Sequence, residues 1–95
     1  MEQKNKYTLI TGASSGIGFE LAKLFAKDDY NLVIVGRNQE DLERRATELK
    51  ASGGEIDVIP ITADLFEPHA AMDIYNETNS RGLQISVLVN DAAQG

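Results

Sequence analysis

Three glycines at fixed spacing constrain the fold of this chain more than any other feature. The segment 11–18 reads Thr-Gly-Ala-Ser-Ser-Gly-Ile-Gly, and it lies between a β-rich run and a helical pattern. Gly12 permits a tight turn out of a strand, Gly16 lets a bound group approach the backbone, and Gly18 lets a helix pack closely on that strand. A helix that begins here points unpaired N–H groups and a partial positive charge at a phosphate. We therefore predict a phosphate-binding turn; the alternative is an ordinary strand-to-helix turn.

Strand-like and helix-like segments alternate along the whole chain. Four short runs have the composition of buried parallel strands: Tyr7–Thr11, Asn31–Gly36, Ile56–Ile61 and Ile85–Val89. Between them, apolar residues recur at helical spacing in three sets: Ile17, Leu21, Leu24 and Phe25; Leu42, Ala46 and Leu49; Ala71, Ile74, Tyr75 and Thr78. The order β-α-β-α-β-α-β predicts an α/β fold, a parallel Rossmann-type sheet with crossover helices and strand order 3-2-1-4.

Turn-forming residues mark the ends of these elements. Asn38 is suited to cap the second helix, and the glycine pair at 53–54 ends it. Pro68 opens the third helix, Gly82 closes it, and Pro60 favours an edge position for the third strand. Right-handed crossovers place the first two helices on one face and the third on the other. We expect that single helix to leave part of its face, and the edge at Ile85–Val89, unshielded.

The composition excludes several classes of protein. The chain has 95 residues, room for one compact domain, and its balance of 42% hydrophobic and 25% charged residues is that of a globular protein. The net charge of −6 argues against a nucleic-acid partner. No apolar run approaches the roughly 18 residues of a membrane span, and we find no signal peptide. Without cysteine there is neither a disulfide framework nor a thiolate metal site, and a cytoplasmic location fits.

The complete set of motifs resembles the short-chain dehydrogenase/reductase family. Besides the glycine turn, the second strand ends in Gly-Arg-Asn at 36–38 and the third in Ala-Asp-Leu at 63–65. The fourth ends in Asn-Asp-Ala-Ala at 90–93, which is similar to that family's Asn-Asn-Ala-Gly. The resemblance covers essentially the whole chain. Two residues depart from this last motif. Asp91 adds a negative charge and Ala93 a methyl group near the position where that family binds its cofactor.

The resemblance implies a bound NADP rather than NAD. Arg37 matches the basic residue that NADP-preferring members place against the 2′-phosphate, and guanidinium binds phosphate bidentately. Gly36 stands where NAD-preferring members carry an acidic residue. The implied cofactor-binding residues are Gly12, Ser14, Ser15, Gly16, Ile17, Gly18, Arg37, Asn38, Asp64, Leu65 and Asn90.

Four of these residues have a simpler alternative reading. Arg37 is then a solvated surface arginine, and Asn38 a plain helix N-cap, although it could do both jobs. Asp64 is then the N-cap of the next turn instead of the acceptor for the adenine amino group. Asn90 is then a residue that ends its strand instead of one at the ribose end of the cofactor.

The resemblance also implies an oxidoreductase that transfers a hydride between the nicotinamide and a carbonyl or alcohol substrate, as a homo-oligomer. The family's catalytic Tyr-x-x-x-Lys is not among these residues, since Thr11, Ile34 and Asn79 stand four positions after the three tyrosines. We therefore expect residues 1–95 to be the dinucleotide-binding part of a larger single-domain enzyme and to be inactive alone. His69, the single histidine, is expected at the surface, and no metal site is expected. The alternatives are a non-catalytic nucleotide-binding or regulatory module, and a fragment that binds nothing.

Overall fold

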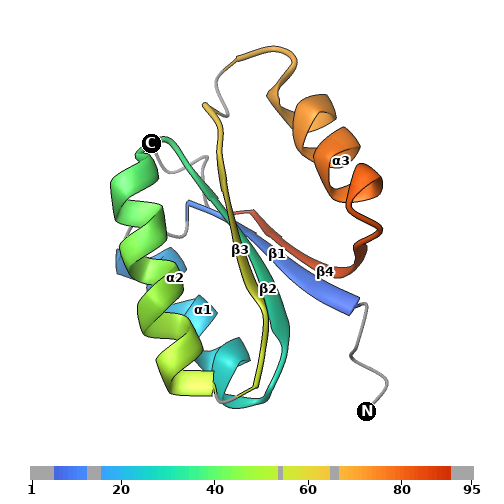
Figure 1. Ribbon diagram of the computed structural model, residues 1–95. Coiled ribbons are helices and arrows are strands. Elements are labelled where there is room, and N and C mark those ends of the chain that lie inside the picture. Colours follow the sequence, from blue (N-terminus) through green and yellow to red (C-terminus); the bar gives the residue numbers. More distant parts are fainter. Residues whose placement is uncertain (1–5, 13–15, 54, 65–66, 91–95) are drawn as a thin grey trace.

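The computed structural model describes residues 6–12, 16–53, 55–64 and 67–90. Its elements are β1 (Lys6–Thr11), α1 (Gly16–Lys27), β2 (Asn31–Gly36), α2 (Gln39–Gly53), β3 (Val58–Thr62), α3 (Ala70–Ser80) and β4 (Gln84–Asn90). The strands pair in parallel in the order β3-β2-β1-β4. Figure 1 shows α1 and α2 on one side of the sheet and α3 on the other. The predicted fold class, strand order and helix placement are confirmed.

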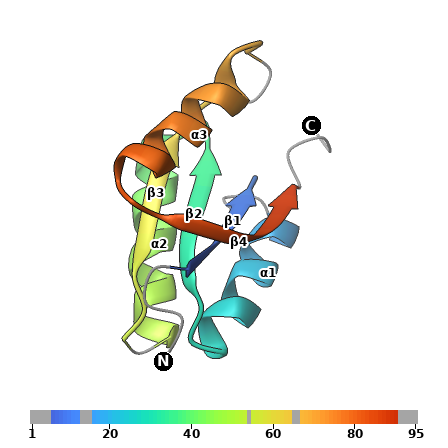
Figure 2. The same ribbon diagram turned by 90° about the vertical axis from the view of Figure 1, so that its right-hand side faces the viewer.

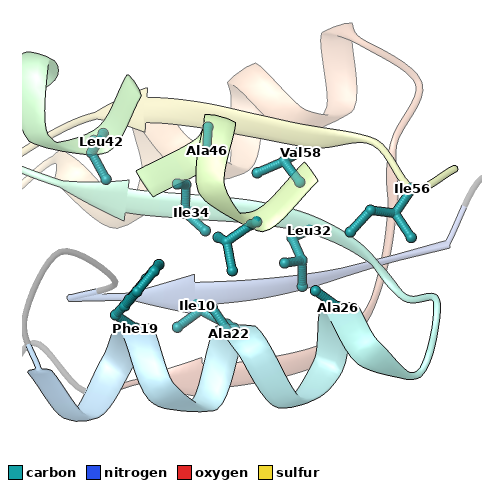
Figure 3. Packing of buried hydrophobic residues seen from close by; sticks show 11 residues of the cluster. Ile10, Phe19, Ala22, Ala26, Leu32, Ile34, Leu42, Ala46, Ile56 and Val58 are labelled. Atoms are coloured by element: carbon teal, nitrogen blue, oxygen red, sulfur yellow. The ribbon is translucent and has the colours of Figure 1, made fainter. Parts of the chain in front are cut away.

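The larger hydrophobic core fills the layer between the sheet and helices α1 and α2 (Figure 3). Ile10, Leu32 and Ile34 enter it from the central strands and are fully buried. Leu42 and Leu49 enter it from α2 and are also fully buried, as their spacing predicts. Each such side chain contributes about 1.5–3 kcal/mol when it leaves water. This layer therefore fixes the two helices on the sheet.

The predicted inward face of α1 is wrong in part: Phe25 packs against the core as expected, but Ile17 and Leu24 do not. The helix buries Gly18, Phe19, Ala22 and Ala26, whereas Ile17 is 67% exposed and Leu24 is 60% exposed. Glycine and alanine at four-residue spacing let the helix axis approach the sheet, and a stripe of larger residues would hold it away. Two of the four residues of the predicted stripe, Ile17 and Leu24, therefore lie on the outer side of this helix.

The predicted face of α3 is wrong in part. Ile74 and Thr78 are buried as expected, but Tyr75 is 65% exposed, and Ala70 rather than Ala71 completes the inward face. Residues 70, 74 and 78 again follow the four-residue spacing of a helix packed closely on strands. His69 is exposed immediately before this helix, in agreement with the expected surface role.

The face of the sheet beneath α3 is covered better than expected. Tyr7 and Leu9 of β1 and Val33 and Val35 of β2 are at most 7% exposed. Ile59, Ile61 and Ile85 on the outer strands are only partly buried against them. The single helix thus shields the centre of this face and leaves its margins incompletely covered. Among the described strands β4 pairs with β1 alone, so it is an edge of this sheet.

The described helices include no candidate for a membrane-spanning segment.

The third strand begins later than predicted, at Val58 rather than Ile56. Ile56 is apolar for another reason: it is 9% exposed and packs beneath the end of α2. A Cβ on Gly53 would lie 2.6 Å from its Cδ1 and 2.8 Å from the carbonyl oxygen of Ala26. Gly53 therefore lets the ends of α1 and α2 meet. Pro60 does lie on an edge strand, as predicted.

We expect Gly53→Ala to destabilise the fold by about 1–3 kcal/mol, because the added methyl group overlaps backbone and a packed side chain. Urea unfolding of the intact protein measures this change. The exposed neighbouring variant Ser52→Ala is the control and should change the free energy of unfolding much less. Equal stability of the two variants would contradict the close approach at Gly53.

A polar network ties the amino ends of three strands together. The Tyr7 hydroxyl donates a 2.8 Å hydrogen bond to Oδ2 of Asp57. The Asp57 backbone N–H donates to Oδ1 of Asn31 at 3.0 Å, and Nδ2 of Asn31 donates to the carbonyl oxygen of Lys6 at 3.3 Å. Burial first, and then the Asp57 carboxylate, raise the pKa of Tyr7 to about 12.

The raised pKa of Tyr7 predicts a loss of stability in alkali. The folded state keeps this hydroxyl protonated, so its contribution is complete below pH about 10 and disappears as the pH rises towards 12. We expect the wild type to lose about 2 kcal/mol more than Tyr7→Phe across this window. Denaturant unfolding at pH 9, 10.5 and 12 tests this, with the exposed-site variant Tyr75→Phe as control. The same pH dependence in wild type and Tyr7→Phe would refute the assignment.

Candidate cofactor site

The carboxyl ends of the strands form one edge of the sheet. Thr11 pairs with Val35 and with Asn90, and Gly36 pairs with Thr62, so the four strands end at the same level. Figure 2 shows the arrowheads of β1, β2 and β4 at this upper side. In parallel α/β sheets this edge is where ligands bind, at the point where the strand order reverses. Here the reversal lies between β1 and β4.

Two backbone hydrogen bonds extend the edge beyond the strands. The Gly12 N–H donates to the carbonyl oxygen of Val35 at 2.9 Å, and the Ala63 N–H donates to that of Gly36 at 2.8 Å. They hold Gly12 beside one side of the end of β2 and Ala63 beside the other. Residues from three separate parts of the chain thus converge on one edge.

The three glycines occupy the positions that their proposed tasks require. Gly12 has φ +69°, a conformation that favours glycine, and it carries the chain out of β1. Gly18 is buried on the inward face of α1. Gly16 is the first residue of α1, and no described atom beyond its own neighbours lies within 4 Å of a Cβ built there. Packing in the described fold therefore does not explain Gly16, and the space beside it is compatible with the predicted approach of a ligand. Ser14 and Ser15 lie outside the described residues.

The N-terminus of α1 is the electrostatically open one. Its first turn holds no acidic residue, whereas Glu40 and Asp41 occupy the first turn of α2 and Asp73 that of α3. A carboxylate in a first turn offsets the positive end of the helix dipole and repels a second anion. Of the three described helices, α1 is therefore suited to a phosphate. The exposed side chain of Ile17 lies in this turn.

Arg37 and Asn38 follow β2 directly, and both are exposed at the edge. Asn38 caps α2, because its Oδ1 accepts the backbone N–H of Asp41 at 3.0 Å. The prediction that Asn38 is a helix N-cap is therefore confirmed. The cap uses only the side-chain oxygen of Asn38. It is therefore compatible with a second role in which the side-chain NH₂ group donates to a ligand.

Asp64 lies at the junction of the edge and a cleft beside α3. It is half-buried, and its carbonyl oxygen accepts the Glu67 N–H at 2.9 Å in the turn toward α3. The cleft has a volume of about 240 Å³ and is lined by Ile61, Thr62, Ala63, Asp64, Glu67, Ala70, Asp73, Ile74 and Glu77. Despite these carboxylates, no group of acidic or histidine side chains in the described part of the chain could hold a metal ion. Leu65 lies outside the described residues.

At the end of β4, Asn90 pairs with Thr11, where the resemblance places it. Sequence reasoning missed the side chain of Thr11, whose hydroxyl donates a long hydrogen bond of 3.4 Å to the carbonyl oxygen of Val89. Because these residues are 78 positions apart, no local pattern could have indicated the contact. Asp91 and Ala93 lie outside the described residues.

Comparison with known proteins identifies the family of this chain. The sequence pattern that defines the short chain dehydrogenases matches residues 6–95. The chain belongs to the short chain dehydrogenase family. It is 39% identical over 89 residues to 17-beta-hydroxysteroid dehydrogenase type 3 of Danio rerio. This match covers 90% of the chain and 27% of that relative. It is 33% identical to the short chain dehydrogenase/reductase dpmpG of Macrophomina phaseolina, which covers 93% of the chain and 50% of that relative.

A solved reductase structure has a similar arrangement of elements. The L-sorbose reductase of Gluconobacter frateurii, in complex with NADPH and L-sorbose, superposes with a TM-score of 0.84 at 31% identity. The match covers 94% of this chain and 34% of the reductase. The chain thus spans a quarter to a half of the length of these short chain dehydrogenases.

The geometry of the turn predicts opposite effects at two of its glycines. Gly12→Ala places a Cβ on a residue with φ +69° and should cost about 1 kcal/mol of stability. Gly16→Ala meets open space at the start of a helix and should leave stability unchanged or raise it by up to about 1 kcal/mol. Thermal and urea unfolding of both variants check this. A destabilised Gly16→Ala would mean that the fold itself requires this glycine.

Proposed function

We propose that this chain is the dinucleotide-binding part of an NADP-dependent oxidoreductase that interconverts a small-molecule carbonyl compound and the corresponding alcohol. The observation that carries the proposal is the meeting of two cationic features at one sheet edge. The acid-free N-terminus of α1 suits the pyrophosphate, and Arg37 at the end of β2 suits a 2′-phosphate. The NADPH complexes of the related reductases support it.

The residues of the edge divide the cofactor among them. The pyrophosphate would lie over Gly12 and Gly16 at the start of α1, with Ser14 and Ser15 as hydroxyl donors. The 2′-phosphate would lie against Arg37 and the amide of Asn38. We assign the binding of the adenine to Asp64 and Leu65. We assign the binding of a ribose at the end of β4 to Asn90. When bound, NADPH supplies the hydride that reduces a carbonyl carbon, and these residues hold and orient it.

The chemical step requires residues beyond this edge. None of the three tyrosines has a lysine four positions later, and the chain spans only part of its relatives' length. We therefore propose that the substrate pocket and the catalytic acid/base belong to further residues of a longer polypeptide, which forms a homo-oligomer. Residues 1–95 alone would then not turn over substrate. An assay of NADPH oxidation with a panel of carbonyl compounds tests the intact protein. NADPH binding without any turnover would favour a regulatory module. The cytoplasmic location stays a prediction.

Reversal of the charge at position 37 tests the cofactor preference. We expect Arg37→Asp to weaken NADPH binding at least about tenfold, because a charge-assisted hydrogen bond contributes about 1.5–3 kcal/mol. NADH binding should be retained or strengthened, since a carboxylate accepts a bond from the ribose 2′-OH. Isothermal titration of the intact protein with both nucleotides measures the ratio. The control Arg81→Asp makes the same charge change after α3, and an unchanged ratio in Arg37→Asp would refute the assignment.

The two roles of Asn38 can be separated with Asn38→Ser. Serine is an equally good N-cap, so stability should stay within about 0.5 kcal/mol of the wild type. The amide NH₂ group is lost, and we expect NADPH affinity to fall several-fold while NADH affinity holds. If neither affinity changes, Asn38 serves the helix alone.

A further inference from the structure

One large side chain interrupts the row of small residues on the inward face of α1. Phe19 lies in the first turn of this helix, next to Gly18, and is 8% exposed. It belongs to the same buried cluster as Leu42 and Ala46 of α2. Figure 3 shows its ring rising from the beginning of α1 into this cluster. The small residues determine how close α1 lies to the sheet, and Phe19 determines how it lies relative to α2.

Two cations lie over the ring. The Cζ atom of Arg45, on α2, is 4.1 Å from the ring centroid, and Nζ of Lys23 is 5.2 Å from it. Both distances are within the range of a cation–π interaction. Arg45 also reaches Oε1 of Glu48 at 3.6 Å, and its Nε is buried with no hydrogen-bond partner among the described residues. The position of this guanidinium is thus determined by the ring and one weak ion pair.

Both helices begin at the candidate cofactor edge. Phe19 is three residues after Gly16, and Arg45 is two helical turns after the cap Asn38. In the proposed binding mode NADP would be held at two places on this edge, by its pyrophosphate at α1 and by its 2′-phosphate at the start of α2. The distance between the two phosphate sites therefore depends on how α1 and α2 pack, which is where Phe19 and Arg45 meet.

We propose that Phe19 and Arg45 form a positioning pair that sets the spacing of the pyrophosphate and 2′-phosphate sites, and thereby the preference for NADP over NAD. The inference rests on the proposed function. NAD contacts the α1 site but carries no 2′-phosphate, so a change in spacing affects it less. Neither residue touches the cofactor; both act through the helices that do.

The test compares nucleotide affinities of Arg45→Met, which keeps the aliphatic stem and removes the planar cation. In the intact protein we expect NADPH affinity to fall about three- to tenfold, the range for residues that act through a neighbour, with NADH affinity changing less than about twofold. In an Arg37→Ser background, Arg45→Met should no longer alter the ratio of the two affinities, because no clamp on the 2′-phosphate remains to be misplaced. Phe19→Leu, which keeps apolar bulk without the ring, should reproduce the loss if Arg45→Met folds poorly.

Two controls separate positioning from long-range attraction and from stability. Lys50→Met removes one positive charge from the far end of α2 and should leave both affinities unchanged. Arg45→Lys keeps the positive charge but lacks the planar group. A ratio of NADPH to NADH affinity as low as that of Arg45→Met supports positioning, whereas the wild-type ratio overturns it. Equal losses for NADPH and NADH, or no loss, also overturn the inference. If Arg37→Asp behaves as expected while Arg45→Met has no effect, only the positioning pair fails; if the wild type binds no NADPH, the proposed function fails as well.

Discussion

The parallel pairing of β1 with both β2 and β4 is the constraint on which the rest of the structure depends. Because parallel strands bring their carboxyl ends to one edge, the residue that follows each strand comes to the same surface without any contact between side chains. The hydrogen bonds from Gly12 to Val35 and from Ala63 to Gly36 continue this order past the strands. The cofactor site is thus a consequence of backbone register before it is a property of particular side chains.

The elements that could be predicted from the sequence are those whose large apolar residues face the core. Strands β1 and β2 and the inward face of α2 belong to this group, since Ile10, Ile34 and Leu49 are all large and fully buried. In α1 the rule inverts: the sheet selects Gly18, Ala22 and Ala26, and Ile17 and Leu24 lie outside. Hydrophobicity alone cannot distinguish the two cases, because close packing on strands rewards small volume rather than apolar area.

The site divides in the same way. The turn glycines and the cap Asn38 follow local rules of backbone and charge, so they could be predicted from spacing. The residues after β2 and β3 were indicated only by the family resemblance. The contact of Arg45 with Phe19 and the bond from Thr11 to Val89 join positions 26 and 78 residues apart. No local pattern contains such contacts; they arise only after the sheet has brought the elements together.

A site made largely of strand ends and a helix N-terminus places few demands on side chains. Backbone positions supply much of the candidate site, and the core beneath requires only apolar residues of suitable volume. The backbone can therefore be conserved while the sequence changes. This accounts for a TM-score of 0.84 with the L-sorbose reductase at only 31% identity. Under the proposed function, cofactor choice would be set without a change of fold by the residues after β2 and, through the proposed positioning pair, by the packing of α1 on α2.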